Sequence, residues 1–180
     1  PQRATGRCSS TLTSSLSGQM RRVEVRRIWP DRLEVRVEEH RAVARWGVGR
    51  GELVNSYGEV FAALLAEEES TGLPLLFGPS GTAPEVLTQF GQLVTRFKAV
   101  NERPVQLTLS PRLAWQLKLG NGMAVDMGRE QPKAPLDVRL ERFIEVYPET
   151  VAKQALRPAV VDLRYPNGFA MRVAGEGKGK

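Results

Sequence analysis

The sequence has few of the residues on which most catalytic and metal sites depend. Its 180 residues include one cysteine, Cys8, and one histidine, His40. A single cysteine cannot form a disulfide within the chain, and one imidazole cannot build the His-rich sites typical of zinc enzymes. The aspartates fall on separate predicted elements, so no two of them are expected to form a catalytic pair. We therefore expect no catalytic residues, no metal site and no cofactor.

Long hydrophobic runs are also lacking. The longest purely apolar run extends from Val60 to Ala66, whereas a membrane-spanning helix needs about 20 residues. No signal peptide opens the sequence. We therefore expect either a cytosolic protein or a chain whose targeting segment lies upstream of Pro1.

The net charge of +6 suggests a nucleic-acid partner at first sight, but the arginines do not form a basic block. In residues 21–27, 31–41 and 138–143 they alternate with acidic or apolar residues, as on solvated faces of strands and helices. We therefore do not expect binding to nucleic acid. A basic nucleic-acid-binding module remains the alternative, and a steep loss of affinity with salt would reveal it.

The N-terminal part of the chain is predicted to contain a β-hairpin after a poorly ordered leader. The first twenty residues are polar, which is typical of a frayed terminus. Residues 21–28 and 32–46 are then predicted as two strands, separated by a turn at Trp29-Pro30-Asp31. One face of this hairpin is expected to be apolar, and it carries Val23, Val25, Leu33, Val35 and Val37.

The middle of the chain is predicted to hold short strands and a helix. Gly47, Gly49 and Gly51 do not have the spacing of a nucleotide-binding loop, so we expect a glycine-rich hairpin. A buried strand is expected at residues 73–77, and Thr82 and Glu85 have the spacing of a capping box at a helix start. The apolar stripe of this helix is Val86, Phe90, Leu93 and Phe97, at helical spacing.

From Pro104 the apolar residues recur at every second position. Residues 105–109, 113–119 and 123–127 are predicted as three consecutive antiparallel strands. A second helix is predicted over residues 134–149, with Pro148 ending it and with Leu136, Leu140, Phe143 and Tyr147 as its apolar stripe. The predicted fold class is α+β, with a curved, mostly antiparallel sheet and two helices packed on one face.

The last predicted element is a hairpin in VVDLRYPNGFAMRV, residues 160–173, with Pro166-Asn167-Gly168 supplying the turn. Its final strand is expected to lie at an open edge of the sheet, where unpaired backbone groups could bind an extended peptide. Alternation places Phe169, Met171 and Val173 on one side and Ala170 and Arg172 on the other. It leaves open the alternative that the three apolar residues simply face the core.

Six segments follow one another along the chain: RRVEVRRIWPDRLEVRVEEHRAVARW, NSYGEVF, LPLLFGPSGTAPEVL, RLAWQLKLGNGMAVDMGRE, RLERFIEVYP and VVDLRYPNGFAMRV. Taken together in this order, they resemble the bacterial cell-division family FtsQ (DivIB). The resemblance covers roughly Arg21 to Val173, and the WPDRL and ARW of the first segment and the VDLRYPNG of the last carry most of it.

The resemblance implies a scaffold without catalytic activity. Members of this family have a cytoplasmic tail, one membrane span, a POTRA domain and a β domain, the last two outside the inner membrane. They bind FtsB and FtsL and help to control septal peptidoglycan synthesis. We therefore expect a location on the periplasmic side of the inner membrane at the division septum, with membrane attachment only through a span outside this sequence.

The resemblance also implies a domain organisation. Residues 1–20 are expected to be an atypical or poorly ordered segment, 21–45 the C-terminal part of a POTRA-like domain, 46–174 the β domain and 175–180 a flexible tail. The first twenty residues do not match the earlier POTRA elements, so we expect the hairpin valines to lack cover and the hairpin to be the least stable region. A POTRA-type secretion or assembly module remains a further alternative.

The family's partner-binding surface lies at the C-terminal end of the β domain. An FtsB-like segment is expected to add as a strand to the final strand, with Tyr165 as the main anchor. Charge-assisted pairs between arginines and acidic partner residues are expected to set its register. The residues expected to contact the partner are Arg112, Arg164, Tyr165, Asn167, Gly168, Phe169, Ala170, Met171, Arg172 and Val173.

Overall fold

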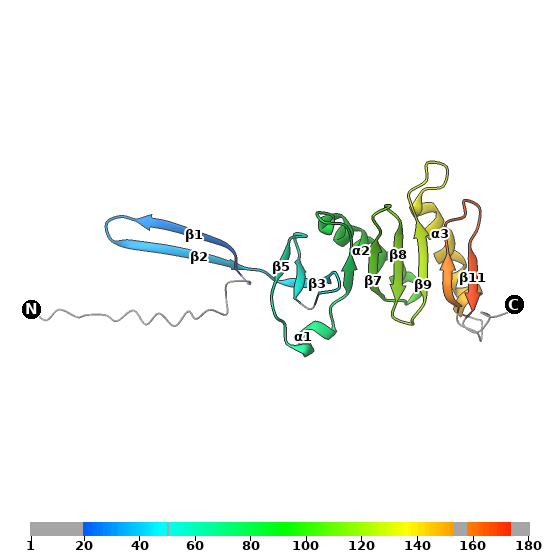
Figure 1. The fold of residues 1–180 in the computed structure, drawn as a ribbon, viewed down its shortest axis with the longest axis horizontal. Helices are drawn as coiled ribbons and strands as arrows, with labels where there is room; N and C mark the ends of the chain where they lie inside the picture. Colours follow the sequence, from blue (N-terminus) through cyan, green and yellow to red (C-terminus); the bar gives the residue numbers. More distant parts are fainter. Residues whose placement is uncertain (1–19, 50, 153–157, 174–180) are drawn as a thin grey trace, which may run out of the picture.

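The computed structural model describes residues 20–49, 51–152 and 158–173 (Figure 1). These residues form a two-stranded sheet and a nine-stranded sheet, with helices packed on the larger one. The poorly ordered leader was expected at residues 1–20, and all of these except Met20 lie outside the described part. The flexible tail expected at residues 175–180 also lies outside it. The α+β fold class predicted from the sequence is confirmed.

The predicted N-terminal hairpin is present as strands β1 (Met20–Ile28) and β2 (Arg32–Glu39). Val23 lies opposite Val37, and Val25 lies opposite Val35, so these valines share one face. The other face pairs arginine with glutamate across the strands, at Arg22–Glu38, Glu24–Arg36 and Arg26–Glu34. Opposite charges facing each other favour this register over a slipped one.

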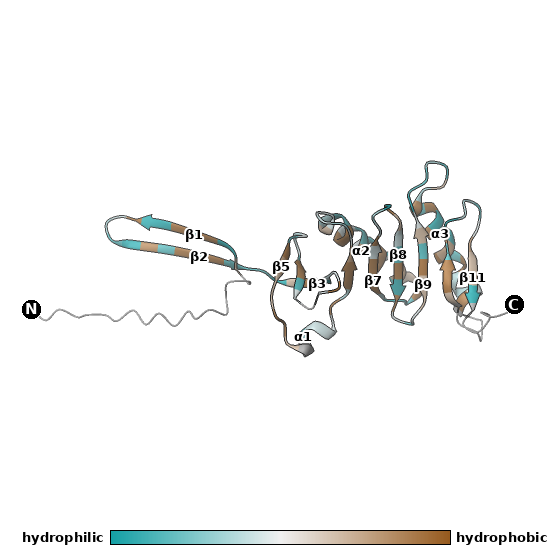
Figure 2. Ribbon diagram, in the orientation of Figure 1, coloured by the Kyte–Doolittle hydropathy of each residue, from teal (hydrophilic) through white to brown (hydrophobic). Residues whose placement is uncertain are grey.

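The apolar face of the hairpin has no cover in the described part of the chain. Leu33 and Val25 are 66% and 63% exposed, and the ribbon stands clear of the large sheet (Figure 1). Figure 2 shows the alternation of hydrophobic and hydrophilic residues along both strands. For the part of the chain that the structure describes, the expectation that these side chains lack cover is therefore confirmed.

We predict that the hairpin amides exchange with solvent much faster than those of the strand that begins at Trp115. An isolated two-stranded ribbon is marginal in water, because it buries little apolar surface. Hydrogen exchange measured by NMR would report this, and equal protection in Val25 and Leu117 would contradict the prediction.

The prediction of a single strand over residues 32–46 is wrong. The chain breaks after β2, and β3 (Ala42–Trp46) joins the large sheet instead. The apolar face is odd-numbered in β2 and includes Val37, whereas the buried residues of β3 are Ala44 and Trp46. A continuous strand cannot change the parity of its buried face, so the backbone must break between them.

The large sheet has the strand order β11-β10-β9-β8-β7-β6-β3-β4-β5. Five neighbouring pairs are antiparallel and three are parallel, namely β3–β6, β6–β7 and β9–β10. The mostly antiparallel sheet and the β7–β8–β9 meander are thus confirmed. The strands not yet given are β4 (Glu52–Asn55), β5 (Val60–Ala62), β6 (Leu75–Phe77), β7 (Pro104–Leu109), β8 (Trp115–Leu119), β9 (Ala124–Gly128), β10 (Pro158–Asp162) and β11 (Ala170–Val173).

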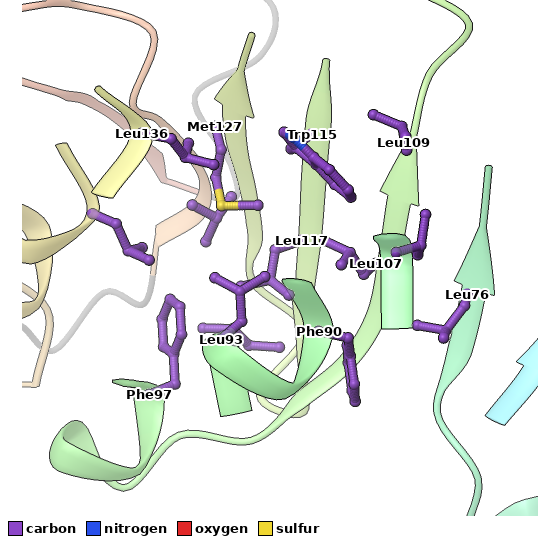
Figure 3. Packing of buried hydrophobic residues seen from close by; sticks show 14 of the residues in the cluster. Leu76, Phe90, Leu93, Phe97, Leu107, Leu109, Trp115, Leu117, Met127 and Leu136 are labelled. Carbon is purple, nitrogen blue, oxygen red and sulfur yellow. The ribbon is translucent and has the colours of Figure 1, made fainter. Parts of the chain in front are cut away.

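Two long helices cover one face of this sheet. They are α2 (Ala83–Phe97), followed by a 3-10 turn at Lys98–Val100, and α3 (Leu136–Tyr147), followed by a π-helical turn at Pro148–Ala152. A short helix, α1 (Glu67–Thr71), precedes β6. All four residues of each predicted apolar stripe are buried in the core between helices and sheet. Figure 3 shows Phe90, Leu93 and Phe97 of α2 and Leu136 of α3 in this core.

Two local predictions are wrong. The Thr82 hydroxyl donates to the Pro79 carbonyl at 2.8 Å and does not cap α2, because the tight turn at residues 78–81 brings that carbonyl within its reach. Leu113 was expected on a strand face, but it lies in the β7–β8 turn with φ +58° and is 59% exposed.

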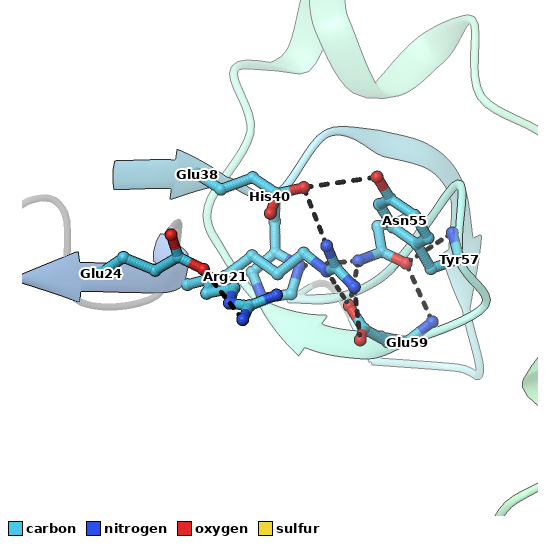
Figure 4. Close-up of polar contacts among 8 residues, drawn as sticks. Arg21, Glu24, Glu38, His40, Asn55, Tyr57 and Glu59 are labelled. Carbon is cyan, nitrogen blue, oxygen red and sulfur yellow. Dashed lines mark hydrogen bonds and ion pairs between the residues drawn. The ribbon is translucent and has the colours of Figure 1, made fainter. Parts of the chain in front are cut away.

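A polar cluster joins the hairpin to the large sheet (Figure 4). Arg21 donates to Glu38 at 2.8 Å and to Glu59 at 2.7 Å, and its guanidinium lies 3.7 Å from the centre of the Tyr57 ring. The hydrogen bond from Arg21, together with one from Asn55, lowers the pKa of Glu59. These contacts orient the base of the hairpin against the β4–β5 turn.

His40 has a structural place beside this cluster. Its ring stacks on Phe61 with centres 4.3 Å apart, and its Nδ1 lies 2.9 Å from the Asn55 side-chain nitrogen. Asn55 in turn accepts hydrogen bonds from the backbone N–H groups of Tyr57 and Glu59. The imidazole therefore helps to hold the chain where it passes from one sheet to the other.

Candidate partner-binding edge

The last strand of the large sheet has a strand neighbour on one side only. β11 pairs with β10 through Val161–Met171 and Asp162–Ala170, and within the described residues no strand pairs with its outer edge. β10 itself lies between β11 and β9. The outer backbone groups of β11 are therefore geometrically open to a further strand.

The side chains of this hairpin divide between the two faces of the sheet. Phe169 and Met171 are partly buried and pack against the core, and the Phe169 ring meets Phe143 of α3 edge-on with centres 5.4 Å apart. Ala170 and Arg172 are exposed on the opposite face. The alternative that the apolar residues face the core thus describes Phe169 and Met171, and the side chain of Val173 lies outside the described part.

A buried arginine fixes the chain just before the turn. Arg139 of α3 is 2% exposed, and its guanidinium donates to the carbonyls of Met127 at 2.6 Å and Leu163 at 2.8 Å. It also donates to Ala134 at 2.9 Å and to Arg129 at 2.7 Å. Burial lowers the pKa of Arg139. One side chain thereby ties together the end of β9, the start of α3 and the exit of β10.

Two further side chains hold the next carbonyls along the chain. Gln131 donates to the carbonyl of Arg164 at 3.0 Å, and Arg142 donates to that of Pro166 at 2.8 Å. The segment that leads into β11 is thus held at three points before the strand begins. A segment held in this way needs little further ordering, and such pre-ordering lowers the entropy cost of any contact made there.

Arg164 folds back onto the sheet. It contacts Asp162 through two hydrogen bonds, of 2.8 Å and 2.5 Å, and its Nε lies 3.7 Å from Asp126. The hydrogen bond from Arg164 lowers the pKa of Asp162, and the same bond raises the pKa of Arg164. The aliphatic stem lies against Gly128, where an added Cβ would be 2.7 Å from Arg164 Cγ.

Arg112 and Arg164 line one open hollow of about 650 Å³, although they are far apart in sequence. Arg129 is the third basic residue in its lining, and the acidic residues are Asp126 and Glu130. The hollow lies beside the β7–β8 turn and the end of β9. Arg112 is exposed and has no ion pair with another described residue.

The remaining predicted contact residues lie in the β10–β11 turn. Tyr165 is 54% exposed, Asn167 is exposed and Gly168 is half-buried. The structure therefore gathers the residues 164–173 along one edge and brings Arg112 near that edge through the shared hollow. Their role in binding a partner stays a prediction.

Residues 44–164 match the model of the family described as cell division protein FtsQ/DivIB, C-terminal. The chain belongs to the FtsQ/DivIB family. The family match ends at Arg164, so β11 itself lies beyond the matched residues, and its open edge is known from the sheet topology alone.

Relatives named cell division protein FtsQ show the same membership. One from Burkholderia pseudomallei is 39% identical over 156 residues, which is 87% of this chain and 61% of the relative. One from Shewanella oneidensis is 43% identical over 150 residues, 83% of this chain and 54% of the relative. The chain thus spans about three-fifths or less of the length of these FtsQ proteins.

None of the described helices is long and apolar enough to cross a membrane. Among the same residues, no group of three or more His, Cys, Asp or Glu side chains is placed to hold a metal ion.

The side chains that support the edge were not predicted from the sequence. Arg139 lies within the apolar stripe of α3, three residues after Leu136 and four before Phe143. A basic residue on the buried face of a helix is unusual unless its donors are satisfied, and this was the signal available. Gln131 and Arg142 are half-buried, one in a loop and one in a helix, and nothing in their sequence context distinguishes them.

Proposed function

We propose that this chain is a non-catalytic scaffold of the division machinery whose β11 edge binds an extended segment of FtsB. The observation that carries the proposal is that β11 has a paired inner edge and an unpaired outer edge within the described residues. An added strand gains backbone hydrogen bonds along that edge, and alternate side chains give specificity.

The two faces of the edge offer different contacts to such a strand. On the helix side, partner side chains meet the partly buried Phe169 and Met171 and extend the core. On the opposite face, partner side chains meet Ala170, whose small side chain leaves space for them, and the exposed Arg172. Tyr165 stands at the end of the edge with an apolar ring and a polar tip, which is the character of an interface anchor.

The arginines of the neighbouring hollow are proposed to bind acidic residues of the partner, with unequal contributions. Arg164 already has Asp162 as a close partner, so a partner carboxylate competes with an existing pair. Arg112 has no such internal pair among the described residues. We therefore expect Arg112 to contribute more to the association rate and register than Arg164.

The wider role follows from the same proposal. FtsL is proposed to join FtsB in the complex, and the scaffold to help control septal peptidoglycan synthesis from the periplasmic side of the inner membrane. The hairpin β1–β2 is proposed to be the C-terminal part of a POTRA-like domain, which would explain a ribbon with one apolar and one charged face.

The proposal is tested by binding of edge variants to the periplasmic segment of FtsB, measured by calorimetry. We expect Tyr165→Ala to weaken binding about 30-fold or more, as for an interface hot spot of about 2 kcal/mol. Arg172→Glu is expected to weaken it as well, by placing an acid where the partner is proposed to be acidic. A charge at Phe169 is a poorer test, because its ring packs on Phe143 and the fold itself would suffer.

The matched control is Lys98→Glu, an equal charge change at an exposed position after α2. It is expected to bind like the parent. Parental affinity in both edge variants, with unchanged melting temperatures, would rule out this edge as the binding site.

A further inference from the structure

A second hollow lies on the face of the large sheet opposite α2 and α3, away from β11. Arg45 of β3 pairs with Leu75 of β6, Leu75 with Gln106 of β7, and Gln106 with Lys118 of β8. These four residues form a row across adjacent strands. A hollow of about 280 Å³ opens beside this row, walled by residues 71–75 and by the chain around Arg103.

The lining of this hollow carries charge of one sign. Arg45, Arg103 and Lys118 line it, and no aspartate or glutamate does. Arg103 is held in place by a hydrogen bond of 3.2 Å to the carbonyl of Gly72. Lys118 is exposed, so its ammonium group is free to approach a ligand.

Arg45 is an unusual member of this set. Its Nε is buried and has no hydrogen-bond partner among the described residues, and no ion pair joins Arg45 to a described carboxylate. A buried donor without an acceptor is destabilising, and a charged donor more so. Because no internal acceptor holds Nε, the guanidinium of Arg45 can turn toward an acceptor supplied from outside the chain in the adjoining hollow.

We propose that this hollow binds a phosphate group. Two guanidinium groups match the oxygens of phosphate through paired hydrogen bonds, and three positive charges suit its dianion better than a single carboxylate. Phosphate esters carry about 1.5 to 2 negative charges at neutral pH. The site involves β3, β6, β7 and β8 and is independent of the proposed β11 edge.

The test is a titration with inorganic phosphate at constant ionic strength, followed by two-dimensional NMR of the amides. We expect saturable shifts at the amides of the non-proline residues among 71–75 and 103–106, which are Thr71, Gly72, Leu73, Leu75, Arg103, Val105 and Gln106. Arg45→Gln and Lys118→Gln are each expected to weaken binding about tenfold, since each removes a charge-assisted contact. The matched control, Lys98→Gln, removes one exposed charge outside the hollow and is expected to bind like the parent.

A second arm identifies the source of the phosphate. Vesicles of phosphatidylglycerol and of phosphatidylcholine are compared by co-sedimentation. Binding to the anionic vesicles that Lys118→Gln abolishes would identify a lipid headgroup, whereas phosphate binding without vesicle binding would identify a soluble phosphate ester. The absence of saturable shifts at these amides, or equal weakening by Lys98→Gln and Lys118→Gln, would overturn the proposal. Because Lys118 is exposed, its variant remains informative even if Arg45→Gln does not fold.

Discussion

Replacing Arg139 with methionine is expected to lower the free energy of unfolding by about 3 to 5 kcal/mol. Methionine has a similar reach and fills much of the same space, but it offers no donor. Four backbone carbonyls, those of Met127, Arg129, Ala134 and Leu163, then lose their contacts to the guanidinium. The loss is large because the site is buried, and water does not readily replace the missing donors.

Urea denaturation with linear extrapolation measures this difference. The matched control is Arg142→Met, which lies on the same helix and makes a single exposed hydrogen bond to Pro166. We expect this control substitution to lower the free energy of unfolding by less than about 1 kcal/mol. Equal destabilisation by the two variants would show that Arg139 does not anchor the β9–α3–β10 junction.

The second large effect is expected from Gly58→Ala in the β4–β5 turn. Gly58 has φ +80°, and a Cβ added there would lie 2.6 Å from the Cα of Pro84. The clash is with backbone at the start of α2, so no side-chain rotation relieves it. We expect the free energy of unfolding to fall by about 3 kcal/mol or more, because the strain of a left-handed backbone and the steric overlap add together.

Gly122→Ala separates these two contributions. Gly122 has φ +90°, but nothing lies within 4 Å of an added Cβ. This variant should show only the conformational cost of about 1 to 2 kcal/mol, measured in the same denaturation series. If the two alanine variants are equally unstable, the close packing of the β4–β5 turn on α2 is not as described.

The spacing of apolar residues predicted much of the fold, because this spacing depends only on whether a segment is a helix or a strand. The stripe from Val86 to Phe97 defines α2 before any tertiary contact is known, and all four of its residues are buried. The β7–β8–β9 meander was predictable for the same reason. The change of parity between Val37 and Ala44 was present in the sequence and should have predicted two strands.

The order of the strands in the large sheet could not be predicted in this way. β3 pairs in parallel with β6, and β6 with β7, through crossovers whose direction no local pattern specifies. The side chains that hold the candidate edge in place could not be predicted for a related reason. Arg139 contacts carbonyls of residues up to 24 positions away, and such contacts depend on the packing of three elements at once.

The most direct test of the proposed function is hydrogen exchange of residues 168–173 with and without the periplasmic segment of FtsB. If the segment adds as a strand to β11, the amides on its outer edge gain hydrogen-bond acceptors, and their exchange is expected to slow on binding. The amides of β5, at the other end of the sheet, should not change. The account is contradicted if a saturating concentration of the FtsB segment leaves the exchange rates of residues 168–173 unchanged and slows exchange elsewhere.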